Sequence, residues 1–120
     1  RLEIKEEDKA LLQSETTYDP NMELPQKLKA FREFQDLAKE NNIEVVYTIP
    51  PSYKPLNKAF VERMREVIDP ESTLFVYDEI DPNYTRDDYF NDPYHVNHRG
   101  GDYFTKDLIH FIKQNKPELK

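Results

Sequence analysis

Residues 43–78 read IEVVYTIPPSYKPLNKAFVERMREVIDPESTLFVYD, and their pattern indicates the fold class. Residues 43–49 are rich in β-branched side chains, which predicts a strand, and the proline pair that follows ends it because proline cannot donate to a strand ladder. Apolar side chains at helical spacing predict a helix over 55–68, and residues 73–78 predict a second strand. A strand–helix–strand unit of this length implies two parallel strands joined by a right-handed crossover.

On either side of this unit, the spacing of apolar residues predicts one helix before it, over 24–42, and one after it, over 98–115. The fold class is therefore α/β. We expect residues 1–20 to form an N-terminal arm or an inserted loop segment, and residues 21–120 to form the domain. Two parallel strands are few for a sheet that is buried on both faces, so we expect either more chain before Arg1 or further strands from a partner.

The composition limits the classes of protein to which the chain can belong. Its 120 residues (14.4 kDa) suffice for one domain and carry a formal net charge of -7. Residues 69–95 hold eight carboxylates against the single base Arg86, so this segment accounts for the whole net charge. A nucleic-acid partner is disfavoured because Lys and Arg are not clustered, and no apolar run approaches the roughly 18 residues that span a bilayer. The absence of cysteine excludes disulfides and thiolate metal sites.

The most informative stretch is YFNDPYHVNHRGG, residues 89–101, which overlaps a long acidic loop that we predict to extend to residue 96. In open α/β sheets, ligands bind beyond the carboxyl ends of the strands, where this loop begins. Asp92 and His95 lie three residues apart in a turn that contains a proline, so the carboxylate can reach one imidazole nitrogen and fix the tautomer. The other nitrogen can then take a proton from a hydroxyl nucleophile. Asn97 is placed to be the N-cap of the last helix.

Two other interpretations of these residues stay open. Asp92 and His95 can belong to a structural turn in which the imidazole bonds a neighbouring carbonyl and the carboxylate is solvated. Alternatively, Asp92, His95 and His98 can hold a metal as three ligands of an open site. Their spacing on a turn that enters a helix spreads the side chains, and the rest of the sequence supplies no obvious fourth ligand. We therefore predict no metal site.

The sequence DPYHVN at residues 92–97, followed by a glycine pair and a terminal helix, resembles the C-terminal block of the SGNH (GDSL-type) hydrolase and acyltransferase family. That family ends with Asp-x-x-His, often followed by x-Asn-x-x-Gly, and its corresponding strand commonly ends as this one does, in Ile-Pro-Pro. The resemblance covers residues 24–115, about the second half of a family domain. It implies a flavodoxin-like three-layer α/β/α sandwich with Asp92 as the orienting acid and His95 as the general base. It implies no metal or organic cofactor.

The family's nucleophile is a serine in a Gly-Asp-Ser block near the start of its domain, and this chain contains no such block. We therefore expect the nucleophile to lie outside this chain, in an N-terminal half of the same domain. In the family, the backbone N–H of that serine is also a donor of the oxyanion hole. Because removing a single oxyanion donor already lowers the rate by about 10²–10³, we expect the isolated 120 residues to be inactive as an esterase. Ser52 is the one internal candidate nucleophile. We assign Ser52, Tyr53 and Tyr94 as candidate substrate-binding residues, although loop tyrosines also serve in packing.

The function that the resemblance implies is that of a serine esterase or O-acyltransferase. Its substrate would be a small-molecule or glycan ester, with acetyl groups on a cell-envelope glycan as one candidate. Relatives of this kind and the absent cysteines favour an extracytoplasmic location, in the cell envelope or secreted. The alternative is a non-catalytic accessory module that binds a carbohydrate or a protein partner through the acidic loop.

Overall fold

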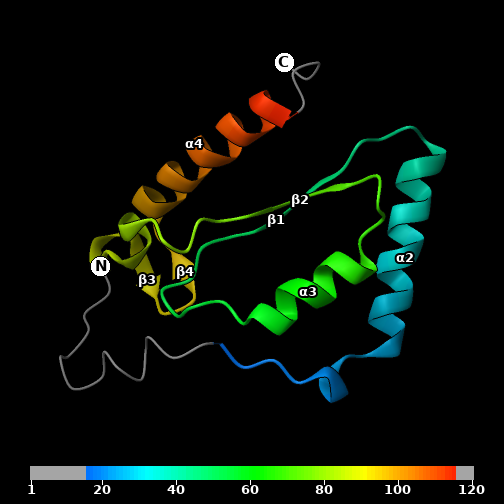
Figure 1. Ribbon diagram of the computed structural model, residues 1–120, viewed down its shortest axis with the longest axis horizontal. Helices are drawn as coiled ribbons and strands as arrows, with labels where there is room; N and C mark the ends of the chain where they lie inside the picture. The colour runs from blue at the N-terminus through cyan, green and yellow to red at the C-terminus, as the bar shows by residue number, and fades with distance from the viewer. Residues whose placement is uncertain (1–15, 116–120) are drawn as a thin grey trace. The chain divides into compact units, whose positions relative to one another are not determined.

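The computed structural model describes residues 16–115, which form a mixed α/β structure with a small parallel two-stranded sheet (Figure 1). The described α-helices and strands are α2 (Pro25–Glu40), β1 (Val46–Ile49), α3 (Lys58–Val67), β2 (Thr73–Val76), β3 (Phe90–Asp92), β4 (His95–Val96) and α4 (His98–Asn115). The arm predicted over residues 1–20 lies largely outside the described residues. None of the helices in residues 16–115 combines the length and the apolar character of a membrane-spanning segment.

The chain divides into two compact units, which are described separately. The first, called here the hairpin unit, contains described residues 16, 48–56 and 75–115. The second, called the helical unit, contains residues 17–47 and 57–74. Strands β1 and β2 pair with each other, and each runs from the helical unit into the hairpin unit.

The predicted helices and strands are present, and the differences at their ends have local causes. Helix α4 has the predicted bounds, whereas α3 begins at Lys58 because the side chain of Asn57 accepts hydrogen bonds from the backbone N–H groups of Ala59 (2.9 Å) and Phe60 (3.3 Å). The first strand begins three residues later than predicted, at Val46. Before it, Asn42 takes a left-handed conformation (φ 55°) that turns the chain out of α2.

The prediction of a long acidic loop as far as residue 96 was wrong in part, because the segment contains regular elements. Two short 3₁₀ helices, η3 (Pro82–Thr85) and η4 (Asp87–Tyr89), are followed by an antiparallel hairpin of β3 and β4. Helix η3 begins where the Asp81 carboxylate accepts the backbone N–H of Asn83 (2.9 Å) and where a proline takes the first helical position. In the same way, the carboxylates of Asp69, Asp78 and Asp92 each accept the backbone N–H two residues further along the chain.

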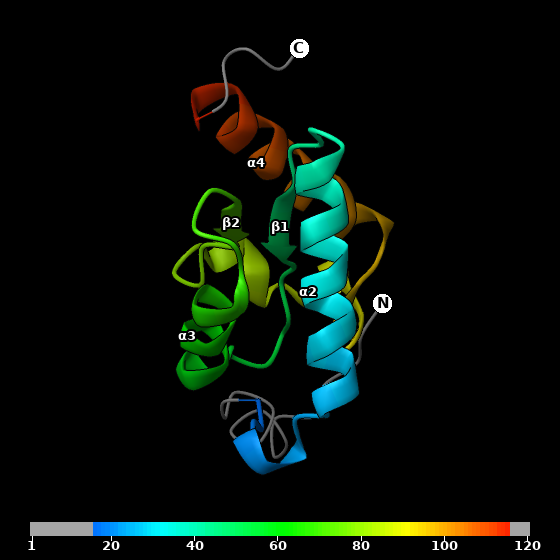
Figure 2. The same ribbon diagram turned by 90° about the vertical axis from the view of Figure 1, so that its right-hand side faces the viewer.

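The helical unit is joined by aromatic contacts and by one buried amide. Phe31 of α2 packs against Tyr47 of β1, with ring centroids 5.4 Å apart. The buried Gln35 side chain donates to the carbonyl oxygen of Val67 (2.9 Å) and accepts the backbone N–H of Asp69. These bonds tie α2 to the end of α3, and Figure 2 shows the ribbons of both helices. A buried amide whose donor and acceptor are both bonded fixes the spacing of the two helices without an unsatisfied polar group.

The hairpin unit has a largely aromatic core. Phe90 and Tyr84 are 0% and 1% exposed, and Tyr53 and Tyr77 are also buried. Phe75 of β2 contacts both Phe104 and Phe111 of α4, with ring centroids 5.8 Å and 4.6 Å apart. These contacts attach α4 to β2 and give the hairpin, which lies at the start of α4, a rigid support.

Candidate active site

The hairpin β3–β4 brings the predicted acid and base into contact. Asp92 and His95 are cross-strand partners, and both carboxylate oxygens of Asp92 lie 2.9 Å from Nδ1 of His95. The His95 side chain is 75% exposed and the Asp92 side chain 46% exposed. An Nδ1–H that donates to a carboxylate fixes the tautomer in which Nε2 carries a lone pair. The geometry therefore leaves Nε2 able to accept a proton from a group in solvent.

The turn between these two residues stabilises the ionised form of Asp92. Its Oδ1 accepts the backbone N–H of Tyr94 at 2.8 Å, the local side-chain-to-backbone bond typical of aspartate before a turn. This N–H, followed by the hydrogen bond from His95, holds the pKa of Asp92 below its ordinary value, although partial desolvation acts in the opposite direction. The carboxylate therefore stays negatively charged, and a negative charge beside the imidazole stabilises the imidazolium that forms when His95 gains a proton.

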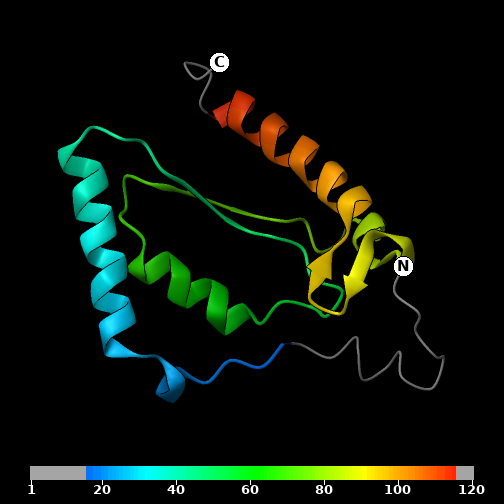
Figure 3. The ribbon, with the colours of Figure 1, turned by 180° about the vertical axis from the view of Figure 1, so that it is seen from behind.

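The tip of the hairpin is held by the loop that follows β1. The ribbon of this loop and of the hairpin is seen from behind in Figure 3. The Ser52 hydroxyl donates to the carbonyl oxygen of Pro93 at 3.0 Å, and the backbone N–H of Lys54 donates to the same oxygen at 3.2 Å. The Tyr77 hydroxyl donates to the Ser52 carbonyl at 3.5 Å, and burial raises the pKa of Tyr77 to about 12. Pro93 lies between Asp92 and the histidine, so these bonds fix the turn that holds the pair together.

The bond to Pro93 determines whether Ser52 is positioned to act as a nucleophile. Its hydroxyl is directed at the Pro93 carbonyl, and no hydrogen bond joins it to His95 within residues 16–115. A serine nucleophile needs its base within hydrogen-bond reach. The observed geometry therefore gives Ser52 a role in shaping the turn, while a contact with substrate stays a prediction.

The two tyrosines predicted to bind substrate lie in different environments. Tyr53 is 4% exposed and meets Phe90 edge to face, with ring centroids 5.7 Å apart, so its ring supports the hairpin from within the core. Tyr94 is 54% exposed and is adjacent to His95 in the chain, where an aromatic face is available to a ligand. Of the two, Tyr94 is the residue whose surface suits contact with a substrate.

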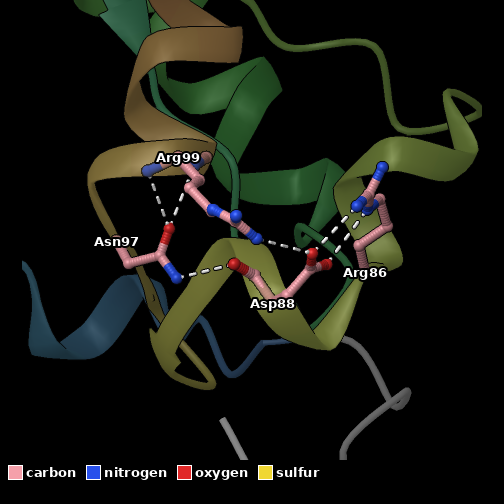
Figure 4. Close-up of polar contacts among 5 residues, drawn as sticks. Arg86, Asp88, Asn97 and Arg99 are labelled. Carbon is pink, nitrogen blue, oxygen red and sulfur yellow. Dashed lines mark hydrogen bonds and ion pairs between the residues drawn. The ribbon is translucent and has the colours of Figure 1, made fainter. Parts of the chain in front are cut away.

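Asn97 closes the base of the hairpin and begins α4, as predicted. Its Oδ1 accepts the backbone N–H groups of Arg99 (2.9 Å) and Gly100 (3.1 Å), which confirms it as the N-cap. Its Nδ2 donates to the carbonyl oxygen of Asp88 at 2.7 Å, and its backbone N–H donates to that of Tyr89 at 2.8 Å. One asparagine therefore links the residues before β3 to the helix after β4 (Figure 4).

The first glycine of the pair is required by close packing. A Cβ atom added to Gly100 would overlap the carbonyl oxygen of Tyr89 and lie 3.0 Å from Cβ of Val96. A Cβ atom added to Gly101 would lie 4.0 Å from Cγ2 of Val96, at ordinary contact distance. Gly100 thus lets the start of α4 approach the base of the hairpin, and Gly101 has no comparable constraint.

The sequence also offered the alternative of a metal site formed by Asp92, His95 and His98. Across residues 16–115, no group of three or more His, Asp or Glu side chains is arranged to hold a metal ion. His98, the third ligand in that alternative, is an exposed residue at the start of α4.

Several polar residues near the hairpin were not anticipated from the sequence. Asp88 binds both Arg86 and Arg99, and the buried Tyr84 donates to Asp107 of α4 at 2.6 Å. Burial, followed by the hydrogen bond to this carboxylate, raises the pKa of Tyr84 well above its ordinary value. The sequence offered one signal for the ion pairs of Asp88, namely Arg86, which is the single base within an acidic run.

No family profile, curated protein sequence or solved structure matches this chain significantly. The assignment of a function therefore depends on the geometry of the hairpin unit and on the sequence motif that it carries.

Proposed function

We propose that this chain carries the acid–base pair of an SGNH-type serine esterase or O-acyltransferase. His95 is the general base, Asp92 orients it, and the serine nucleophile lies outside this chain. The observation that carries the proposal is the contact of both Asp92 oxygens with Nδ1 of His95, which leaves Nε2 exposed. The substrate is an ester, with O-acetyl groups on an extracytoplasmic glycan as our leading candidate.

The chemistry of this arrangement follows from the identity of its atoms. Nε2 of His95 accepts the proton of a serine hydroxyl as its oxygen attacks the ester carbonyl, and it later returns that proton to the departing alkoxide. The negative charge of Asp92 stabilises the imidazolium formed between these two steps. The lowered pKa of Asp92 supports this role because the carboxylate stays ionised at neutral pH.

We also propose that this chain is the C-terminal part of a flavodoxin-like three-layer domain. The parallel pairing of β1 and β2 and the position of the acid–base pair after the last parallel strand support it. In such folds, catalytic groups gather beyond the carboxyl ends of the parallel strands. The N-terminal half of the same domain would supply the remaining strands, the nucleophile and the oxyanion-hole donors.

The test is ester turnover by the protein at its full native length. His95→Ala should lower kcat by about 10²–10⁴, the usual contribution of a general base, and Asp92→Asn should also lower it strongly by disturbing the tautomer. His98→Ala is the matched control because His98 is a neighbouring exposed histidine outside the pair. Turnover that survives His95→Ala at the wild-type rate would refute the proposal.

A second candidate function is a non-catalytic module that binds a carbohydrate or a protein partner. The observation that favours it is the concentration of charge, since residues 69–95 hold eight carboxylates and one base. A module of this kind would bind a glycan or a basic protein surface, and His95→Ala would leave that binding unchanged. Binding without ester turnover by the full-length protein would favour this second function.

A further inference from the structure

The hairpin that carries Asp92 and His95 is too small to fix their geometry alone. Strand β3 has three residues and β4 has two, and an isolated two-stranded hairpin is marginally stable in water. The orientation of the imidazole therefore depends on the contacts at the two ends of the hairpin. Ser52 and Lys54 hold the tip through the carbonyl oxygen of Pro93.

The base of the hairpin is held by a second group of contacts, centred on Asp88. Asp88 lies in η4, which leads directly into β3, and its carbonyl oxygen accepts the amide of Asn97, which directly follows β4. This backbone contact is independent of the Asp88 side chain. The Asp88 carboxylate makes a separate connection between η4 and the start of α4.

The Asp88 carboxylate binds two guanidinium groups that come from opposite sides of the hairpin base (Figure 4). Arg86, which precedes η4, donates from Nε to Oδ1 at 3.0 Å and from Nη2 to Oδ2 at 2.8 Å, in a bidentate pair. Arg99, in the first turn of α4, donates from Nη1 to Oδ2 at 3.3 Å. Arg86 also lies over the ring of Tyr89, 4.4 Å from its centroid.

This arrangement makes the carboxylate a bridge between two positively charged side chains. The Asp88 side chain is 26% exposed, less than either arginine. Arg86 above all, and to a lesser extent Arg99, lowers the pKa of Asp88, so the bridge is charged at neutral pH. Without the carboxylate, the two guanidinium groups would lose their shared partner, and the first turn of α4 would lose its side-chain link to η4.

We infer that Asp88 is a positioning residue for the Asp92–His95 pair, an inference that rests on the proposed function of that pair. Arg86 orients the Asp88 carboxylate, which links η4 to the first turn of α4 through Arg99 and so sets the direction in which the His95 imidazole points. Catalysis is sensitive to such shifts, since a misplacement of about 1 Å can lower a rate by about 10²-fold.

The experiment compares Asp88→Asn with Asp87→Asn in the protein at its full native length. Asp87 is the matched control because it is the adjacent carboxylate in η4 and makes no ion pair with any described residue. We expect Asp88→Asn to lower kcat at least about tenfold with KM unchanged, and Asp87→Asn to change neither. Selective ¹⁵N labelling of histidine gives a second readout, in which Asp88→Asn should shift the Nδ1 resonance of His95.

Arg99→Gln provides a second variant if Asp88→Asn fails to fold, because it breaks only the link to α4. An unchanged kcat together with an unchanged Nδ1 resonance in the folded variant would overturn the inference. Failure of the proposed function has a different signature, which is turnover that survives His95→Ala. In that case, a shifted Nδ1 resonance in Asp88→Asn would still support the positioning role, and an unshifted one would refute it.

Discussion

Replacing Asn97 with alanine removes two separate contributions to the stability of the hairpin unit. The first is the N-cap, in which Oδ1 accepts the backbone N–H groups of Arg99 at 2.9 Å and Gly100 at 3.1 Å. The second is the hydrogen bond from Nδ2 to the carbonyl oxygen of Asp88 at 2.7 Å. Because the two use different atoms of one amide, a second substitution can separate them.

The size of each contribution follows from its chemistry. Loss of an N-cap costs about 1 kcal/mol, and loss of a neutral hydrogen bond costs about 1 kcal/mol. Asn97→Ala should therefore lower the free energy of unfolding by about 2 kcal/mol. Serine also caps helices but has no amide donor, so Asn97→Ser should lower it by only about 1 kcal/mol.

Equilibrium unfolding in urea, followed by far-ultraviolet circular dichroism on the full-length protein, measures these differences. Asn91→Ala is the control, since Asn91 is an exposed residue of β3 and its substitution should stay within about 0.5 kcal/mol of wild type. A loss below about 0.5 kcal/mol for Asn97→Ala would refute the described role of this residue. Equal losses for the serine and alanine variants would show that the cap contributes nothing.

Three further predictions concern other features of the hairpin unit. Gly100→Ala should lower the melting temperature because overpacking costs about 1–3 kcal/mol of unfolding free energy, whereas Gly101→Ala should be neutral or slightly stabilising. Equal effects of the two substitutions on thermal unfolding would contradict the packing described for Gly100. Tyr84→Phe should lower the free energy of unfolding by about 1.5–3 kcal/mol, because it removes a hydrogen bond to the Asp107 carboxylate, and a neutral result in urea unfolding would exclude that bond. The folded state lowers the pKa of Asp92, so the stability that this carboxylate contributes is complete above about pH 4 and is lost as the pH falls through the folded pKa. Asp92→Asn should therefore flatten the acid limb of a profile of unfolding free energy against pH, and an unaltered limb would contradict this contribution.

The parts of the fold that the sequence predicted are those with strong local signals. Helix α4 was predicted with its observed bounds because Asn97 is a good N-cap and the apolar residues after it repeat at helical spacing. The contact between Asp92 and His95 was predicted because three residues and a proline turn separate them, and it is confirmed. Their catalytic role stays a prediction.

The parts that the sequence did not predict depend on contacts between distant residues or on very short elements. Strands of three and two residues, as in β3 and β4, are too short to show an alternating pattern. The bond from Ser52 to the Pro93 carbonyl joins residues 41 positions apart, and the bond from Gln35 to the Val67 carbonyl joins residues 32 apart. Local propensity carries no information on such pairs, since only the packed fold brings them together.

Whether His95 activates a serine can be measured by covalent labelling of the full-length protein with a fluorophosphonate, followed by determination of the intact mass. This probe reacts with a serine only when a general base activates it. We predict one adduct on the wild-type protein, one adduct on Ser52→Ala, and none on His95→Ala. A wild-type protein without an adduct, or equal labelling of the His95→Ala variant, would contradict the assignment of Asp92 and His95 as the acid–base pair of a serine hydrolase.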